Sequence, residues 1–146
     1  MGGLRVVPDA ALTDFEPASA DILILPGGDS WMASERPEIS VAVRAMAEAG
    51  RPVAAICAAT LALAHAGLLD DRLHTSNGAG FIEKYVPGYS GTGYYRTAAA
   101  ISDRAVITAS GVAPIAFAAE IFRLMTPERA QDIAMYESLY ARGFIE

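Results

Sequence analysis

The residue in this chain best suited to covalent chemistry is Cys57, its only cysteine. An apolar run from Val53 to Ile56 predicts a strand, and the Ala- and Leu-rich run that follows predicts a helix ending at Gly67. Cys57 is therefore expected on a sharp strand-to-helix turn, the geometry of a nucleophile elbow. Beside the free N–H groups at a helix start, a thiol ionises more readily, and the thiolate is its reactive form.

A lone cysteine also has a purely structural interpretation. Free cysteines are among the most buried residue types and often serve as small core residues. In that case Cys57 would be sealed in the interior and would take no part in chemistry. The exposure of its sulfur atom separates the two interpretations.

A second feature lies upstream, where an apolar strand over residues 21–25 ends in Pro26-Gly27-Gly28. Two adjacent glycines after a parallel strand let the backbone approach a reacting group closely and direct an N–H into the site. A plain turn is the alternative interpretation. The combination of the glycine pair with an elbow cysteine favours a site.

Three blocks of sequence form a recognisable set. They are Ile24-Leu-Pro-Gly-Gly28, Ala54-Ala-Ile-Cys-Ala58 and Ile107-Thr-Ala-Ser-Gly-Val-Ala-Pro-Ile-Ala-Phe-Ala118. Together, and in this order, they resemble the ThiJ/PfpI family of the class I glutamine amidotransferase-like superfamily. The resemblance implies a flavodoxin-like fold, a homodimer, and hydrolase, glyoxalase-like or amidotransferase-like activity on a small carbonyl or amide substrate. We expect no cofactor.

The resemblance also suggests what surrounds the sulfur. The N–H groups of Gly28 and Ala58 would stabilise an oxyanion on a Cys57 adduct. Five further residues near the ends of predicted strands are candidates for the pocket: Asp29, Trp31, His74, Asn77 and Ser110. For each of them, core packing or a plain loop is the alternative.

Histidine, the usual base beside a catalytic cysteine, is unfavourably placed. Hydrolytic members of the family commonly carry it directly after the nucleophile, where this chain has Ala58. His65 is two turns along the elbow helix, too far to touch Cys57. His74 could approach from the same subunit or across a dimer. Without a neighbouring base, Cys–His proteolysis or glutaminase chemistry is weakly supported.

Two classes of function therefore stay open. In the first, the protein is an enzyme whose thiolate attacks a small carbonyl or amide-like substrate, giving a hemithioacetal or an acyl-thiol intermediate. In the second, it is an oxidative-stress sensor or binding module in which Cys57 is oxidised reversibly to a sulfenic acid, or further to a sulfinic acid. Turnover that depends on Cys57 would favour the enzyme.

Predicted strands and helices alternate along most of the chain. Beyond the two strands already named, strands are expected at 4–7, 73–76, 98–101 and 105–108, with a hairpin-like turn at 102–104. Further helices are expected from 34 to 50, with Ser34 as N-cap, and over 113–125 and 127–142. This order predicts one domain over 1–146, a three-layer α/β sandwich with a mostly parallel sheet covered on both faces. Sites in such sheets lie at the carboxyl ends of strands, where Gly28 and Cys57 would fall.

The resemblance implies a further strand, helix and strand before Gly2. We therefore expect that the sequence is an N-terminally truncated record of a longer protein, or that another chain or segment fills the gap. In the family, the loop after the first of those strands supplies a glutamate that hydrogen-bonds the cysteine. The remaining sheet would expose unpaired backbone and apolar surface at its edge.

Composition narrows the remaining possibilities. The 146 residues are 53% hydrophobic and only 19% charged, enough apolar material for a real core. The formal charge of −6, without Lys/Arg clusters, argues against nucleic-acid or anionic-membrane partners. A single cysteine forms no internal disulfide, no His/Cys cluster suggests a metal, and no apolar run is long enough to span a bilayer. We expect a cytoplasmic protein.

Overall fold

A four-stranded sheet organises the chain, of which the computed structural model describes residues 5–142. The strands are β1 (Leu23–Leu25), β2 (Val53–Ile56), β3 (Ala100–Asp103) and β4 (Val106–Ala109). Their order is β1-β2-β4-β3, with β1, β2 and β4 parallel and β3 antiparallel to β4. The mostly parallel sheet predicted from the sequence is confirmed.

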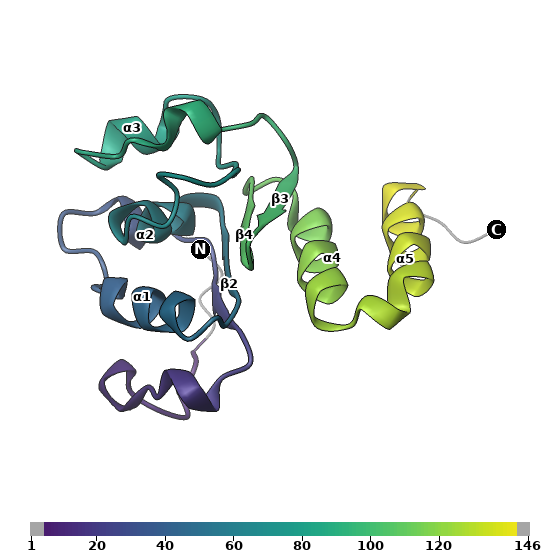
Figure 1. The fold of residues 1–146 in the computed structure, drawn as a ribbon, viewed down its shortest axis with the longest axis horizontal. Coiled ribbons are helices and arrows are strands. Elements are labelled where there is room, and N and C mark those ends of the chain that lie inside the picture. The colour runs from purple at the N-terminus through teal and green to yellow at the C-terminus, as the bar shows by residue number, and fades with distance from the viewer. Residues whose placement is uncertain (1–4, 143–146) are drawn as a thin grey trace.

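Helices cover the sheet from two sides. They are α1 (Ser40–Glu48), α2 (Thr60–His65), α3 (Phe81–Tyr85), α4 (Pro114–Met125) and α5 (Ala130–Arg142). Figure 1 shows α1, α2 and α3 on one side of the strands, and α4 and α5 on the other. This is the predicted three-layer α/β arrangement. No helix in the described range is long and apolar enough to cross a membrane.

Strand β2 lies at the centre of the core and is packed on both of its faces. Val53 and Ala55 point into one apolar cluster, shared with α1 and α2, whereas Ala54 points into a second cluster that contains Phe117 of α4. Alternate residues of a strand face opposite sides of the sheet, so β2 is buried on both faces. Cys57 directly follows this fixed strand.

Strand β1 differs from the expectation that helices cover it on both faces. It forms one edge of the sheet, and Ile24 is 46% exposed. Helix α4 packs mainly on β4 and β3, with fewer contacts to β2. The helix layer on that side therefore leaves β1 partly open.

The first helix begins later than predicted. The expected N-cap, Ser34, lies in a turn, and α1 starts at Ser40. Pro37 disfavours helical geometry at the residue before it, and the Glu38 carboxylate accepts the Ser40 N–H at 2.8 Å. Hydrogen bonding from the side chain of Ser40, and then from its backbone N–H, lowers the pKa of Glu38. The prediction at Ser34 was wrong because Glu38 provides the competing start signal.

Two predicted strands are corrected. Of residues 4–7, Leu4 lies outside the described residues and 5–7 form no strand. Residues 73–76 contain only an isolated bridge, between His74 and Tyr95. The reason is that side chains take the backbone donors there: Asp103 accepts the Leu73 N–H at 2.8 Å, and Thr108 accepts the Thr75 N–H at 2.9 Å.

The C-terminal part follows the prediction closely. Strands β3 and β4 form the expected hairpin, with bounds shifted by one or two residues. Its turn residues Arg104 and Ala105 both have positive φ, 49° and 63°, as tight two-residue hairpin turns require. The two final helices are α4 and, after a 3-10 turn at Pro127–Arg129, α5.

Candidate functional site

Cys57 stands at the junction that the sequence predicted. It is the first residue of a 3-10 turn, Cys57–Ala59, that joins β2 to α2. Its φ is 61°, in the left-handed region that non-glycine residues rarely adopt. The residue is partly exposed, so it is not sealed in the core. A strained residue at the carboxyl end of a central parallel strand is the arrangement of a nucleophile elbow.

Two glycines allow other segments to approach Cys57. A Cβ atom on Gly111 would lie 2.7 Å from the Cys57 Sγ, and one on Gly27 would lie 2.8 Å from the Cys57 Cβ. Neither position accommodates a side chain without movement. The close approach predicted for the glycine pair is thus made by Gly27, and the N–H role of Gly28 stays a prediction.

Asn77 is the candidate residue that the structure brings directly to the sulfur. Its Nδ2 donates to the Cys57 Sγ at 3.3 Å, and its Oδ1 accepts the Gly111 N–H at 3.0 Å. One side chain therefore joins the elbow to the segment that follows β4. Residues from three separate parts of the chain meet at this point.

Two buried hydroxyl groups, those of Thr60 and Ser76, form hydrogen bonds at the elbow. Thr60 Oγ1 donates to the Cys57 carbonyl oxygen at 2.8 Å and lies 2.7 Å from Ser76 Oγ. Because a hydroxyl has one proton, Ser76 is the donor in the second bond. Both side chains are almost fully buried. Ser76 directly precedes Asn77, so this pair also fixes the start of the loop that contacts the sulfur.

His74 is fully buried and has partners away from Cys57. Its Nδ1 lies 2.8 Å from the Arg72 carbonyl oxygen, which only accepts, so Nδ1 carries the proton. Its Nε2 then accepts the Tyr89 hydroxyl at 2.5 Å. Burial lowers the pKa of His74 and raises that of Tyr89 well above its usual range. These hydrogen bonds join His74 to Arg72 and Tyr89 and not to Cys57, so the catalytic role considered for His74 stays a prediction.

The other histidine, His65, also has a partner other than Cys57. His65 Nδ1 lies 3.4 Å from a guanidinium nitrogen of Arg36. Burial, followed by the charge of Arg36, lowers the pKa of His65. Since the arginine can only donate, His65 Nδ1 accepts this bond. Within the described residues, neither histidine is hydrogen-bonded to Cys57.

The remaining candidates occupy different environments. Trp31 belongs to the core, and its Nε1 donates to the Pro26 carbonyl oxygen at 2.9 Å. Asp29 is exposed on a 3-10 turn, Asp29–Met32. Ala58 is buried within the elbow, and the Ser110 N–H donates to the Ala99 carbonyl oxygen at 3.0 Å. Their functional roles stay predictions, and Trp31 already has a structural one.

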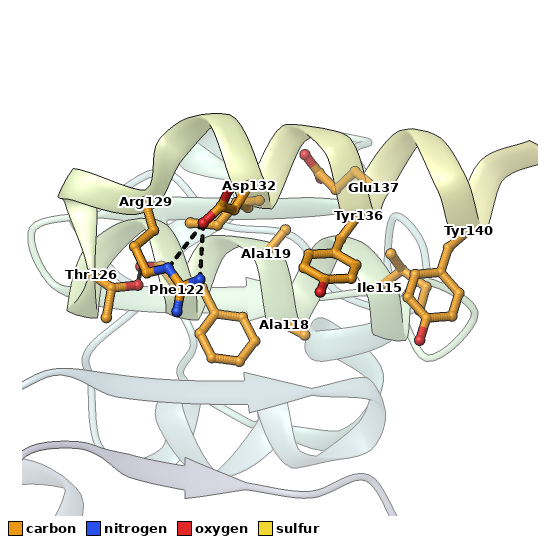
Figure 2. A pocket seen from close by; sticks show the side chains of 11 residues that line it. Ile115, Ala118, Ala119, Phe122, Thr126, Arg129, Asp132, Tyr136, Glu137 and Tyr140 are labelled. Atoms are coloured by element: carbon orange, nitrogen blue, oxygen red, sulfur yellow. Dashed lines mark hydrogen bonds and ion pairs between the residues drawn. The ribbon is translucent and has the colours of Figure 1, made fainter. Parts of the chain in front are cut away.

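A cavity of about 500 Å³ lies away from the cysteine, between α4 and α5. Figure 2 shows Phe122, Tyr136 and Tyr140 along it, with an ion pair between Arg129 and Asp132 at 2.9 Å. None of its lining residues belongs to the elbow or to the Asn77 loop. The cavity is therefore separate from Cys57.

Sequence reasoning missed two residues that shape the site, Thr60 and Ser76. Thr60 and Ser76 are buried hydroxyls in apolar surroundings, a pattern that could have indicated a structural hydrogen bond. Gly27 and Gly111 lie inside the blocks noticed in the sequence, and their closeness to Cys57 agrees with the close approach expected there.

Several known proteins resemble this chain in sequence and in fold. The family model described as DJ-1/PfpI family matches residues 1–124. The chain belongs to the DJ-1/PfpI family. The resemblance identified from the three sequence blocks is thus confirmed, together with the fold that it implied.

Named members of the DJ-1/PfpI family show the range of relatives. The Bacillus subtilis protein "Uncharacterized protease YoaZ" is 40% identical over 123 residues, which is 84% of this chain and 59% of that protein. "Glutathione-independent glyoxalase DJR-1.2" of Caenorhabditis elegans is 38% identical over 73 residues, 49% of this chain and 39% of that protein. This chain thus spans less than two thirds of the length of either.

A solved structure matches over more of the chain. The DJ-1 superfamily protein Atu0886 from Agrobacterium tumefaciens superposes with a TM-score of 0.84 at 36% sequence identity. The match covers 95% of this chain and 76% of that one. The sheet and helices described above are therefore the family's own arrangement.

Proposed function

We propose that this protein is a cysteine-dependent enzyme in which Cys57 attacks the carbonyl carbon of a small substrate. The observation that carries the proposal is the placement of the only cysteine, partly exposed and with a φ of 61°, at the carboxyl end of a central parallel strand. Such strain is retained where the surrounding structure enforces it, and it clusters at working sites.

The first step is addition of the thiolate to the carbonyl group. The sulfur lone pair forms a C–S bond while the C=O π pair moves onto the oxygen, which takes a proton from water. The product is a hemithioacetal. The N–H groups of Gly28 and Ala58 are the donors proposed to hold the developing oxyanion. With an α-ketoaldehyde, the hydrogen on the hemithioacetal carbon then moves to the neighbouring carbonyl carbon, giving a thioester. Water cleaves the C–S bond and releases the hydroxy acid and the Cys57 thiol. One substrate carbon is oxidised and its neighbour reduced, so no external oxidant enters.

Addition to an aldehyde is favoured over cleavage of an amide. Amide cleavage needs an acid to protonate the leaving nitrogen, commonly a histidine beside the cysteine. Here Ala58 follows the cysteine, and the hydrogen-bond partners of His65 and His74 lie elsewhere. The relative that is named a glutathione-independent glyoxalase also supports addition to an aldehyde.

The test is turnover of methylglyoxal, measured as lactate formed, beside a panel of amide and peptide substrates. We expect lactate from the parent protein and none from Cys57→Ser, with both proteins giving the same circular dichroism spectrum. Glu128→Gln, an exposed change far along the chain from Cys57, serves as the control. Equal rates for Cys57→Ser and the parent would refute the proposal.

A redox sensor is the second candidate, favoured by the partial exposure of the only cysteine. Peroxide transfers one oxygen to the thiolate and leaves as hydroxide, giving a sulfenic acid. Mass spectrometry after mild peroxide treatment would show a gain of one oxygen that dithiothreitol reverses. This gain in a protein that turns over none of the substrates would favour the sensor.

A further inference from the structure

We infer that Asn77 is a positioning residue for the Cys57 sulfur, whose amide stabilises the negative charge that the sulfur carries when it attacks. The inference deepens the proposed function and rests on Cys57 being the working group. The N–H of the Asn77 amide donates to Sγ at 3.3 Å. A donor of this kind favours the thiolate over the thiol, because a hydrogen bond to a charged acceptor is stronger than one to a neutral acceptor.

The orientation of the Asn77 amide is determined by its other contact. An asparagine side chain has one accepting end and one donating end, and the two can be exchanged by a half-turn. The backbone N–H of Gly111 can only donate, and it lies 3.0 Å from Oδ1. The amide nitrogen must therefore face the sulfur. Gly111 acts here through its backbone, so the orientation does not depend on a neighbouring side chain.

The position of Asn77 is anchored by buried neighbours. Ser76, directly before it, is hydrogen-bonded to Thr60 at 2.7 Å, and Thr60 in turn binds the Cys57 carbonyl oxygen. The N–H of Thr75 donates to Thr108 Oγ1 on β4 at 2.9 Å. The loop thus carries Asn77 on two residues fixed to the elbow and to the sheet. The donor is in place before any substrate binds.

An aspartate at position 77 gives the sharpest test, because it changes one of the two contacts and keeps the other. Its Oδ1 still accepts the Gly111 N–H, while the atom facing the sulfur becomes a negatively charged acceptor. The matched control is Ala79→Asp, which adds the same charge to the same exposed loop. The only additional variant needed is Asn77→Ala, which removes the donor without adding charge.

The measurement is the rate of alkylation by iodoacetamide as a function of pH. The chain has one cysteine, so the reaction reports on Cys57 without background. We expect the midpoint of the rate profile to rise by about one pH unit in Asn77→Ala, as for loss of one hydrogen bond to a charged atom. It should rise further in Asn77→Asp than in Ala79→Asp, because the carboxylate introduced at position 77 also places a negative charge against the sulfur.

An unchanged midpoint in Asn77→Ala would overturn the inference, whatever Asn77→Asp shows. Equal midpoints in Asn77→Asp and Ala79→Asp would overturn it as well. The assay needs no substrate. A shifted midpoint in a protein without turnover would support the inference and refute the proposed function. Turnover with unshifted midpoints would refute the inference and support the proposed function.

Discussion

Replacing Gly111 with alanine tests how tightly the site is assembled. The added Cβ would lie 2.7 Å from the Cys57 Sγ, 3.0 Å from the Cys57 Cβ and 3.2 Å from the Asn77 Oδ1. The approach to sulfur falls 0.7 Å short of the 3.4 Å at which ordinary contact begins. Overpacking of this kind costs about 1–3 kcal/mol. The exposed segment around Val112 can move, so we expect the lower end of that range.

The displaced atoms are the sulfur and its donor, so reactivity should fall more clearly than stability. We expect Gly111→Ala to lower the melting temperature by about 4 °C, for about 1 kcal/mol in a chain of this size. The iodoacetamide rate at pH 7 should drop about tenfold, corresponding to about 1.4 kcal/mol on the activation free energy. Gly93→Ala is the matched control, because a Cβ there meets nothing within 4 Å. A Gly111→Ala protein that reacts as fast as Gly93→Ala would refute the packing argument.

Two further predictions concern the buried polar groups. Neutral, buried His74 has a lowered pKa, so its contribution to stability is complete above the unfolded value of about 6.5 and is lost as pH falls through the folded value. Urea unfolding between pH 7.5 and 4.5 should show this loss, and an equal loss in His74→Gln would contradict it. Thr60→Val should destabilise by about 1–3 kcal/mol in urea unfolding, because it leaves the Ser76 hydroxyl and a carbonyl oxygen buried without their partner. An unchanged urea midpoint would show that these groups find other partners.

The sequence predicted the features that depend on local pattern. The β2–elbow–α2 unit follows from an apolar run that passes into helix formers, and the α4 helix follows from its own periodicity. What it missed depends on competition between side chains and backbone. Residues 73–76 have strand-like composition, yet Asp103 and Thr108 take two of their backbone donors. Likewise, Trp31 is predicted as a rim residue after a glycine turn, but its ring is buried in the core and its indole N–H donates to the Pro26 carbonyl oxygen.

The strain at Cys57 persists because several independent contacts hold the same residue. Its carbonyl oxygen is held by Thr60, its sulfur by Asn77, and its side chain packs against a glycine on either side. A residue in the left-handed region costs about 1–3 kcal/mol and survives only where such contacts leave no alternative. The contacts extend to Thr108 in the middle of β4, through the Thr75 N–H and the residues that lead to Asn77. The placement of the loop that reaches the sulfur therefore depends in part on Thr108, a buried threonine of the sheet.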